Sequence, residues 1–181
     1  SIDGRVLIVP GGAITGEQIL INGGGGNDNL TLDFVGGNPI PAGGLKFNGG
    51  GQTSARGDEI TLSTGNVDTV DYVFINENDG SIAVDGRTVN YVGLEPVTDN
   101  LSATTRSFTF TGPAETITVI DGAVDGMTEI DSDLAGEVVN FFSSPTTSLT
   151  IVTGGGDTTN ITSFDPGFNA PLLSLQGTGA T

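Results

Sequence analysis

The 181-residue sequence lacks histidine, cysteine and tryptophan. Without histidine there is no imidazole to act as a general base, a zinc ligand or a member of a serine triad. Without cysteine, disulfides, thiolate metal sites and cysteine nucleophiles are excluded. The side chains that remain for catalysis are mainly carboxylates and hydroxyls, so we expect that the protein is not an enzyme.

Basic residues are also scarce. The chain has 22 acidic and five basic residues, which gives a formal net charge of −17. No basic stripe is present to neutralise phosphates, so we expect neither nucleic-acid binding nor attraction to anionic membranes. No run approaches the roughly 20 apolar residues of a membrane helix, which also argues against membrane insertion.

Helix signals are nearly absent, and short alternating apolar segments take their place. Glycine, threonine, asparagine and aspartate dominate, and these residues are poor helix formers. Runs of β-branched and aromatic residues between Gly, Asn, Asp and Pro clusters indicate strands. We predict strands at Val6–Val9, Ile19–Ile21, Leu30–Phe34, Leu45–Phe47, Ile60–Ser63, Tyr72–Ile75, Ser81–Val84, Thr88–Val92, Ser107–Thr111, Thr116–Ile120, Val138–Phe142, Leu149–Thr153, Ile161–Phe164 and Leu172–Leu175.

These strands recur with a regular spacing. Ile19 and Leu45 each begin an apolar alternation before a glycine turn, 26 positions apart, and Val73 follows 28 positions later. A period in this range is typical of stacked repeats that bury an apolar face only against their neighbours. We therefore predict one all-β domain over residues 1–181, a right-handed parallel β-helix of roughly six to seven coils. The alternative is a β-sandwich with evenly spaced hairpins.

Two segments stand apart from this pattern. Residues 121–137 are acidic, and we expect them to form a loop that bulges from the coil. The segment Leu173–Gly177 matches Ile19–Gly23 in its order of apolar residues and glycine. Residues 172–181 are therefore interpreted as the start of a next tandem copy, or as an end that stacks on another molecule.

Several segments resemble modules of very large secreted or surface proteins of environmental bacteria: Gly23–Phe34, Pro41–Leu45, Asp79–Gly86, Tyr91–Pro96 and Phe108–Gly112. The piece Gly23–Thr31 is in addition similar to the calcium-binding RTX nonapeptide G-G-x-G-x-D-x-U-x. The resemblance implies a parallel β-helix, an extracellular or cell-surface location, calcium binding and a structural or adhesive role. The chain departs from RTX proteins because its nonapeptides are not in direct tandem.

Calcium prefers six to eight oxygen ligands from carboxylates and backbone carbonyls. Asp28 and Asp58 follow glycine turns one repeat apart, so their half-sites are expected to stack, with Asn27 and Asp79 in the same column. The insertion Gln52–Arg56 interrupts the second turn and brings an arginine close to the expected cation. The alternative is that these residues only shape turns.

A second acidic group is centred on Asp131 and Asp133. In an extended segment Glu129, Asp131 and Asp133 project to one face, which would bring three carboxylates together. Such a group needs either a cation or water around it. We therefore list Asp131 and Asp133 as metal candidates, with a solvated acidic loop as the alternative.

The function predicted from these features is structural. We expect a β-solenoid module or subunit of an extracellular filament, surface fibre or surface layer that stacks head-to-tail on itself. One alternative is a calcium-dependent adhesin or carbohydrate-binding module with surface glycans as partners. A more distant one is a β-helix enzyme acting on glycans, which needs only two suitably spaced carboxylates.

Overall fold

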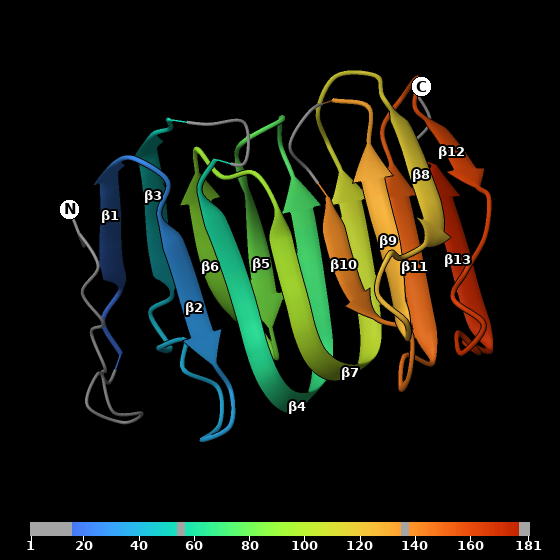
Figure 1. Ribbon diagram of the computed structural model, residues 1–181, viewed down its shortest axis with the longest axis horizontal. Coiled ribbons are helices and arrows are strands. Elements are labelled where there is room, and N and C mark those ends of the chain that lie inside the picture. Colours follow the sequence, from blue (N-terminus) through green and yellow to red (C-terminus); the bar gives the residue numbers. More distant parts are fainter. Residues whose placement is uncertain (1–15, 54–56, 135–137, 178–181) are drawn as a thin grey trace.

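The computed structural model describes residues 16–53, 57–134 and 138–177, and these form thirteen β-strands (Figure 1). The strands are β1 (Ile19–Gly25), β2 (Asn29–Asp33), β3 (Leu45–Gly51), β4 (Glu59–Phe74), β5 (Gly80–Val84), β6 (Arg87–Val92), β7 (Val97–Phe110), β8 (Thr116–Asp121), β9 (Met127–Ser132), β10 (Val139–Phe142), β11 (Ser148–Thr153), β12 (Thr158–Ile161) and β13 (Leu172–Gly177). The all-β class expected from the sequence is confirmed. In the described ranges no helix is long and apolar enough to span a membrane.

The strands lie in two rows along the long axis of the molecule, joined where β4 and β7 bend from one row into the other (Figure 1). The first row consists, in order, of β1, β3, β6, β5, the second half of β4, the second half of β7, β11 and β13. The second row consists, in order, of β2, the first half of β4, the first half of β7, β10, β9, β8 and β12. The result is a mixed, non-closed sheet, with eight parallel and four antiparallel pairings.

All four antiparallel pairings come from two meanders. In the first, β4 continues into β5 and β6, so that β6 returns to pair with β3. In the second, β8 continues into β9 and β10, so that β10 returns to pair with β7. The turn between β5 and β6 is Asp85-Gly86, with φ of 47° and 76°. Two consecutive positive φ values are those of a type I′ turn, whose twist matches that of the flanking strands.

The first step of the predicted period corresponds to a parallel pairing of Ile19 with Leu45. Leu30 also pairs with Ile60, and Leu149 with Leu173, in parallel strands. The second step of the predicted period is wrong, because Leu45 pairs with Val89 of β6 and not with Val73. The cause is the first meander, which inserts a local hairpin between neighbouring rungs of the row.

Other differences from the predicted strands are local. Residues 121–137, expected as an acidic loop, contain strand β9. Strand β7 begins at Val97, well before the predicted Ser107, and β12 ends at Ile161 where the predicted strand begins. The predicted strand Val6–Val9 lies outside the described residues.

The core lies between the two rows. Inward positions alternate along each strand, so β4 and β7 bury every second side chain over much of their length. Aromatic rings form a stack at its centre: Tyr72 lies 4.8 Å from Phe108, and Phe74 lies 4.8 Å from Phe110, between ring centroids. Stacked and tilted ring contacts of this kind contribute stability beyond the apolar area that the rings bury.

The core is open at the end formed by β12 and β13. Leu173 and Leu175 pair with Leu149 and Ile151, which are fully buried, so they occupy inward positions. Nevertheless Leu173 is 39% and Leu175 54% exposed. Ile161 of β12 is likewise exposed, although its partner Val119 is buried. The inward apolar face therefore continues to the end of the described stack without a cover among the described residues.

Candidate functional site

Asp28 and Asp58 meet at a corner where the chain passes from one row to the other. Each lies one residue before a strand, and these strands, β2 and β4, pair in parallel with Asn29 opposite Glu59. The backbone N–H of Asp28 donates a 2.7 Å hydrogen bond to Oδ1 of Asp58. The two aspartates, expected one above the other from the spacing of the glycine turns, are therefore neighbours in the structure.

The second carboxylate oxygens set this corner apart. Oδ2 of Asp28 and Oδ2 of Asp58 are both buried, and neither has a hydrogen-bond partner among the described residues. The Asp58 side chain is fully buried. Burial raises the pKa of Asp58 and the nearby Asp28 carboxylate adds to the shift, whereas the hydrogen bond from the Asp28 amide opposes it.

Glycines on the adjoining strands make room for these carboxylates. A Cβ on Gly23 would lie 2.5 Å from the carbonyl oxygen of Gly49 and 2.7 Å from Oδ2 of Asp28. A Cβ on Gly49 would lie 2.5 Å from the carbonyl oxygen of Gly93 and would also meet Oδ2 of Asp58. Each carboxylate therefore packs against bare backbone, with a neighbouring carbonyl oxygen beside it.

This donor set fits a hard cation in kind. Buried carboxylate oxygens without partners, next to carbonyl oxygens, are the ligands that Ca²⁺ takes. Asp28 and Asp58 would hold the ion, and the carbonyls of Gly49 and Gly93 lie in the same corner. In the described part of the chain, no group of three or more carboxylates is placed to hold a metal ion. A cation here would therefore need backbone or water oxygens as well.

Asn27 and Asp79 flank this corner and both have partners. Oδ1 of Asn27 accepts hydrogen bonds from the N–H and the hydroxyl of Thr53, both at 3.0 Å. Oδ1 of Asp79 accepts from the N–H of Gly93 at 3.1 Å, and its Oδ2 accepts from Asn76. Asp79 thus orients the glycine whose carbonyl lies beside Gly49. Arg56, expected near the cation, lies outside the described residues.

Asp131 and Asp133 lie in the second meander, apart from the first corner in the strand order. Glu129 and Asp131 share the outward side of β9, and Asp133 follows directly. Burial raises the pKa of Asp131, with smaller contributions from Glu129 and Asp133. Oδ1 of Asp133 accepts a 2.8 Å hydrogen bond from the N–H of Thr116, which lowers the pKa of Asp133.

This bond repeats one in the first meander. Oδ1 of Asp85 accepts from the N–H of Thr69, and the N–H of Asp85 donates to the Thr69 carbonyl. Asp133 exchanges the same two bonds with Thr116. The structural role of Asp133 is therefore to join the end of β9 to the start of β8.

A second acidic corner repeats the geometry of Asp28 and Asp58. Glu115 and Asp157 precede the parallel strands β8 and β12, and the N–H of Glu115 donates to Oδ1 of Asp157 at 3.2 Å. Oδ2 of Asp157 accepts from Gly154, and the carboxylate of Glu115 accepts from the hydroxyl of Ser132. Burial raises the pKa of Glu115. Asp157 follows three consecutive glycines, whereas no local pattern marks Glu115.

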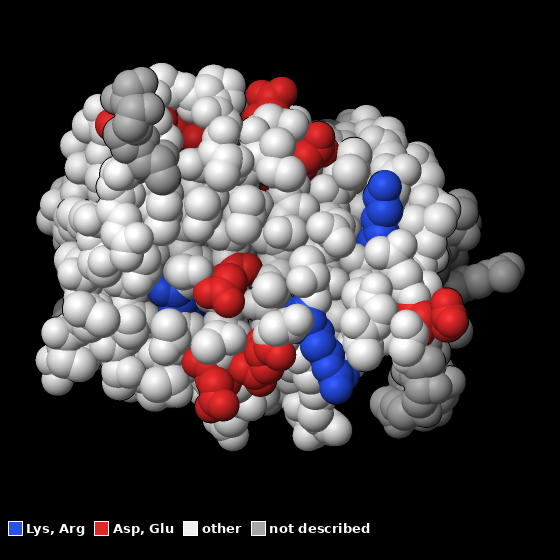
Figure 2. Space-filling model, turned by 180° about the vertical axis from the view of Figure 1, so that it is seen from behind, with Lys and Arg blue, Asp and Glu red and all other residues white. Residues whose placement is uncertain are grey.

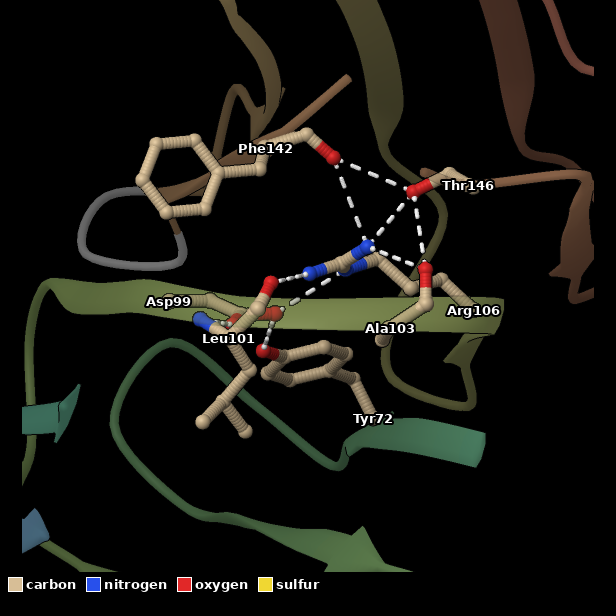
Figure 3. Close-up of polar contacts among 7 residues, drawn as sticks. All are labelled: Tyr72, Asp99, Leu101, Ala103, Arg106, Phe142 and Thr146. Atoms are coloured by element: carbon tan, nitrogen blue, oxygen red, sulfur yellow. Dashed lines mark hydrogen bonds and ion pairs between the residues drawn. The ribbon is translucent and has the colours of Figure 1, made fainter. Parts of the chain in front are cut away.

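No pattern in the sequence marks the buried ion pair at the bend of β7. The guanidinium of Arg106 and the carboxylate of Asp99 are fully buried and lie 3.0 Å apart, from Nε to Oδ2 (Figure 3). Tyr72 donates its hydroxyl to the same Oδ2 at 2.8 Å. Burial, followed by the Asp99 charge, raises the pKa of Tyr72 well above its ordinary value. Charges that are spaced seven residues apart along a strand meet here because the strand bends.

Arg106 also connects three backbone segments. It donates to the carbonyls of Leu101 at 2.6 Å, Ala103 at 3.2 Å and Phe142 at 3.4 Å, and to the Thr146 hydroxyl at 2.5 Å (Figure 3). Its guanidinium carbon lies 5.0 Å from the centroid of the Phe141 ring. A fully hydrogen-bonded ion pair of this kind fixes one arrangement of β7 and β10.

Charge on the rear face of the molecule is dispersed. Figure 2 shows acidic side chains scattered among uncharged ones on the rear face, with basic side chains well separated.

Comparisons with protein-family models, curated proteins and solved structures find no match to this chain. The functional argument therefore rests on the geometry described above.

Proposed function

We propose that this chain is a structural module of an extracellular filament, surface fibre or surface layer, built as a parallel β-solenoid that continues end to end. The observation that carries the proposal is the open core at β12 and β13. Inward-facing Leu173 and Leu175 are exposed there, as is Ile161, where a further rung would bury them. Burial of such side chains is worth roughly 25 cal/mol per Å² of apolar area.

The direction of the strands supports a parallel solenoid. In the first row, β1 and β13 run in the same direction, since the intervening pairings include two antiparallel steps. In the second row, the same holds for β2 and β12. A second copy could therefore add its β1 to β13, and its β2 to β12, as parallel pairs. Sandwiches, by contrast, are built mostly from antiparallel strands.

The inward side chains of β1, at the opposite end of the stack, are apolar like those of β13. Ile19 and Ile21 of β1 pack against the core and pair with the buried Leu45 and Phe47. Ile19–Gly23 and Leu173–Gly177 share apolar residues at the first and third positions, an amide side chain at the fourth and glycine at the fifth. A copy stacked on β13 would make a heterologous contact, which propagates into a filament unless the rotation closes a ring.

Sedimentation tests this directly. The intact chain should associate reversibly as its concentration rises, and electron microscopy should show rods. Leu173→Asp with Leu175→Asp should abolish association, because both charges would face the buried contact. Leu172→Asp is the matched control, since Leu172 is exposed on the outward side of the same strand. A monomer at every concentration would contradict the stacking of separate copies.

A calcium-dependent adhesive module is the second candidate function. The observation that favours it is the pair of buried, unpartnered Oδ2 atoms of Asp28 and Asp58. Calcium at this corner would fix the first rungs of both rows. In this case the loops would bind a partner only in the calcium-loaded form, so chelation should remove binding without removing the strands.

A further inference from the structure

A surface groove of about 380 Å³ lies where β4 and β7 bend between the two rows. Its volume falls within the range of small-ligand sites. The bend brings together residues of β4, β7 and the end of β10, so the groove exists only in the folded chain. Its lining residues are Thr64, Gly65, Asn66, Asn100, Ser102 and Phe142.

The lining is uncharged although the chain as a whole carries a net charge of −17. It offers two side-chain amides, two hydroxyls and one aromatic ring. Among the described residues, the side chains of Asn66, Asn100 and Ser102 form no hydrogen bonds, and neither does that of Thr64. These groups are therefore free to donate to and accept from a ligand. Phe142 is half-buried and adds an apolar surface.

The buried ion pair holds this lining in place. Asp99 accepts from the N–H of Leu101, and Arg106 donates to the carbonyls of Leu101 and Phe142. Asn100 lies between Asp99 and Leu101 in the chain, so its backbone is fixed on both sides. Figure 3 shows the Phe142 ring pointing away from the guanidinium while its carbonyl points toward it. Rigid support of this kind preorganises a binding site.

The backbone of Thr64 is strained at the same place. Its φ is 35°, in the left-handed region that β-branched residues rarely adopt. The register between β4 and β7 shifts between Leu62 and Gly65, so this conformation belongs to the bend. Strain of this kind is concentrated at functional sites and persists because the surrounding structure enforces it.

We propose that this groove binds a neutral sugar residue of a glycan chain. Sugars combine many hydroxyls, which amides and hydroxyls recognise, with a C–H face that packs on an aromatic ring. An uncharged lining in an acidic protein disfavours acidic sugars and phosphorylated ligands. The site is independent of the proposed stacking, since its residues lie at the bends of β4 and β7 and at the end of β10, and not on β12 or β13.

The test combines ligand-observed and protein-observed NMR on the intact chain. The probes are glucose, galactose, mannose, N-acetylglucosamine and their β-linked disaccharides at millimolar concentration, with glucuronic acid as the charged comparator. At least one neutral probe should show saturation transfer and shift the amide signals of Asn66 and Ser102. Affinity should fall about tenfold or more in Asn66→Ala and in Phe142→Ala, as expected when hydrogen-bonding or stacking groups are lost.

Asn160→Ala on β12 is the matched control, because Asn160 is exposed and lies outside the groove. It should bind as the parent does. Asn66 is exposed, so its truncation leaves the core intact even if Phe142→Ala lowers stability. The proposal is overturned if no neutral sugar binds, if glucuronic acid binds better than the neutral probes, or if both groove variants bind unchanged.

Discussion

The N–H of Asp28 donates a 2.7 Å hydrogen bond to Oδ1 of Asp58, and the remaining oxygen of each carboxylate is buried without a partner among the described residues. Two carboxylates held this close repel one another unless a proton or a cation neutralises one of them. We therefore expect the corner to respond to calcium and to pH, and the two responses can be separated.

The first prediction concerns calcium. Adding Ca²⁺ to chelator-treated protein should raise the melting temperature, because a ligand that binds the folded state stabilises it. At one hundred times the dissociation constant, the gain is about 2.7 kcal/mol, or about 5–10 °C for a chain of this size. Differential scanning calorimetry measures the shift, and both Asp28→Ala and Asp58→Asn should abolish it.

The control for this experiment is Asp68→Asn, an exposed carboxylate outside the corner. Its calcium response should equal that of the parent protein. Melting curves that coincide with and without chelator would rule out a stabilising calcium site.

The second prediction concerns pH in the absence of calcium. Burial raises the pKa values of Asp58, Glu115 and Asp131. A carboxyl whose pKa is raised on folding binds more protons in the folded state, so stability falls as pH rises through that folded pKa. The melting temperature should therefore rise as pH is lowered from 7 toward 5. Asp133, whose pKa is lowered, opposes this only in a more acidic range.

Asp58→Asn provides the check on this assignment. The amide keeps an acceptor for the Asp28 N–H but removes the buried charge, so the variant should be more stable than the parent at pH 7 and show a weaker pH dependence. Thermal melts between pH 4.5 and 7.5 in chelator measure both. An identical slope in the two proteins would show that Asp58 does not contribute.

The third prediction concerns the ion pair of Asp99 and Arg106. Arg106→Met leaves a buried, uncompensated carboxylate and should lower the free energy of unfolding by about 3–5 kcal/mol. Replacing both partners, Arg106→Met with Asp99→Leu, should recover a large part of this loss, since the unpaired charge is gone. Urea unfolding measures each value.

Tyr72→Phe is the milder comparison at the same place. It removes one hydrogen bond to Asp99 and should cost about 1–2 kcal/mol. If the double variant were no more stable than Arg106→Met alone, the lost stability would come from the missing packing of the arginine and not from the unpaired Asp99 carboxylate.

The fourth prediction concerns the glycines at the acidic corner. Gly49→Ala should destabilise the protein by about 1–3 kcal/mol, because the new Cβ would meet Oδ2 of Asp58 and the Gly93 carbonyl. Gly25→Ala is the matched control, with no atom within 4 Å of its new Cβ. Chemical unfolding should place it within about 0.5 kcal/mol of the parent. Equal stabilities of the two variants would refute the steric role of Gly49.

The sequence by itself determined the all-β class, because alternation of apolar residues and the scarcity of helix formers act locally. It also determined the first registers: the 26-residue spacing of the glycine turns places Ile19 opposite Leu45, and the matching apolar residues after these turns align Leu30 with Ile60. The place of Asp28 beside Asp58 came from the order of these turns in the repeat.

Only the tertiary structure decided the rest. The Asp85-Gly86 turn signals a hairpin, but the sequence does not say that β6 returns to β3 and displaces Val73 from the predicted period. Glu115 meets Asp157, and Asp99 meets Arg106 and Tyr72, only after strands distant in the chain are paired and bent. Local patterns set which segments extend, whereas long-range packing selects their neighbours and so creates the buried charges and the groove.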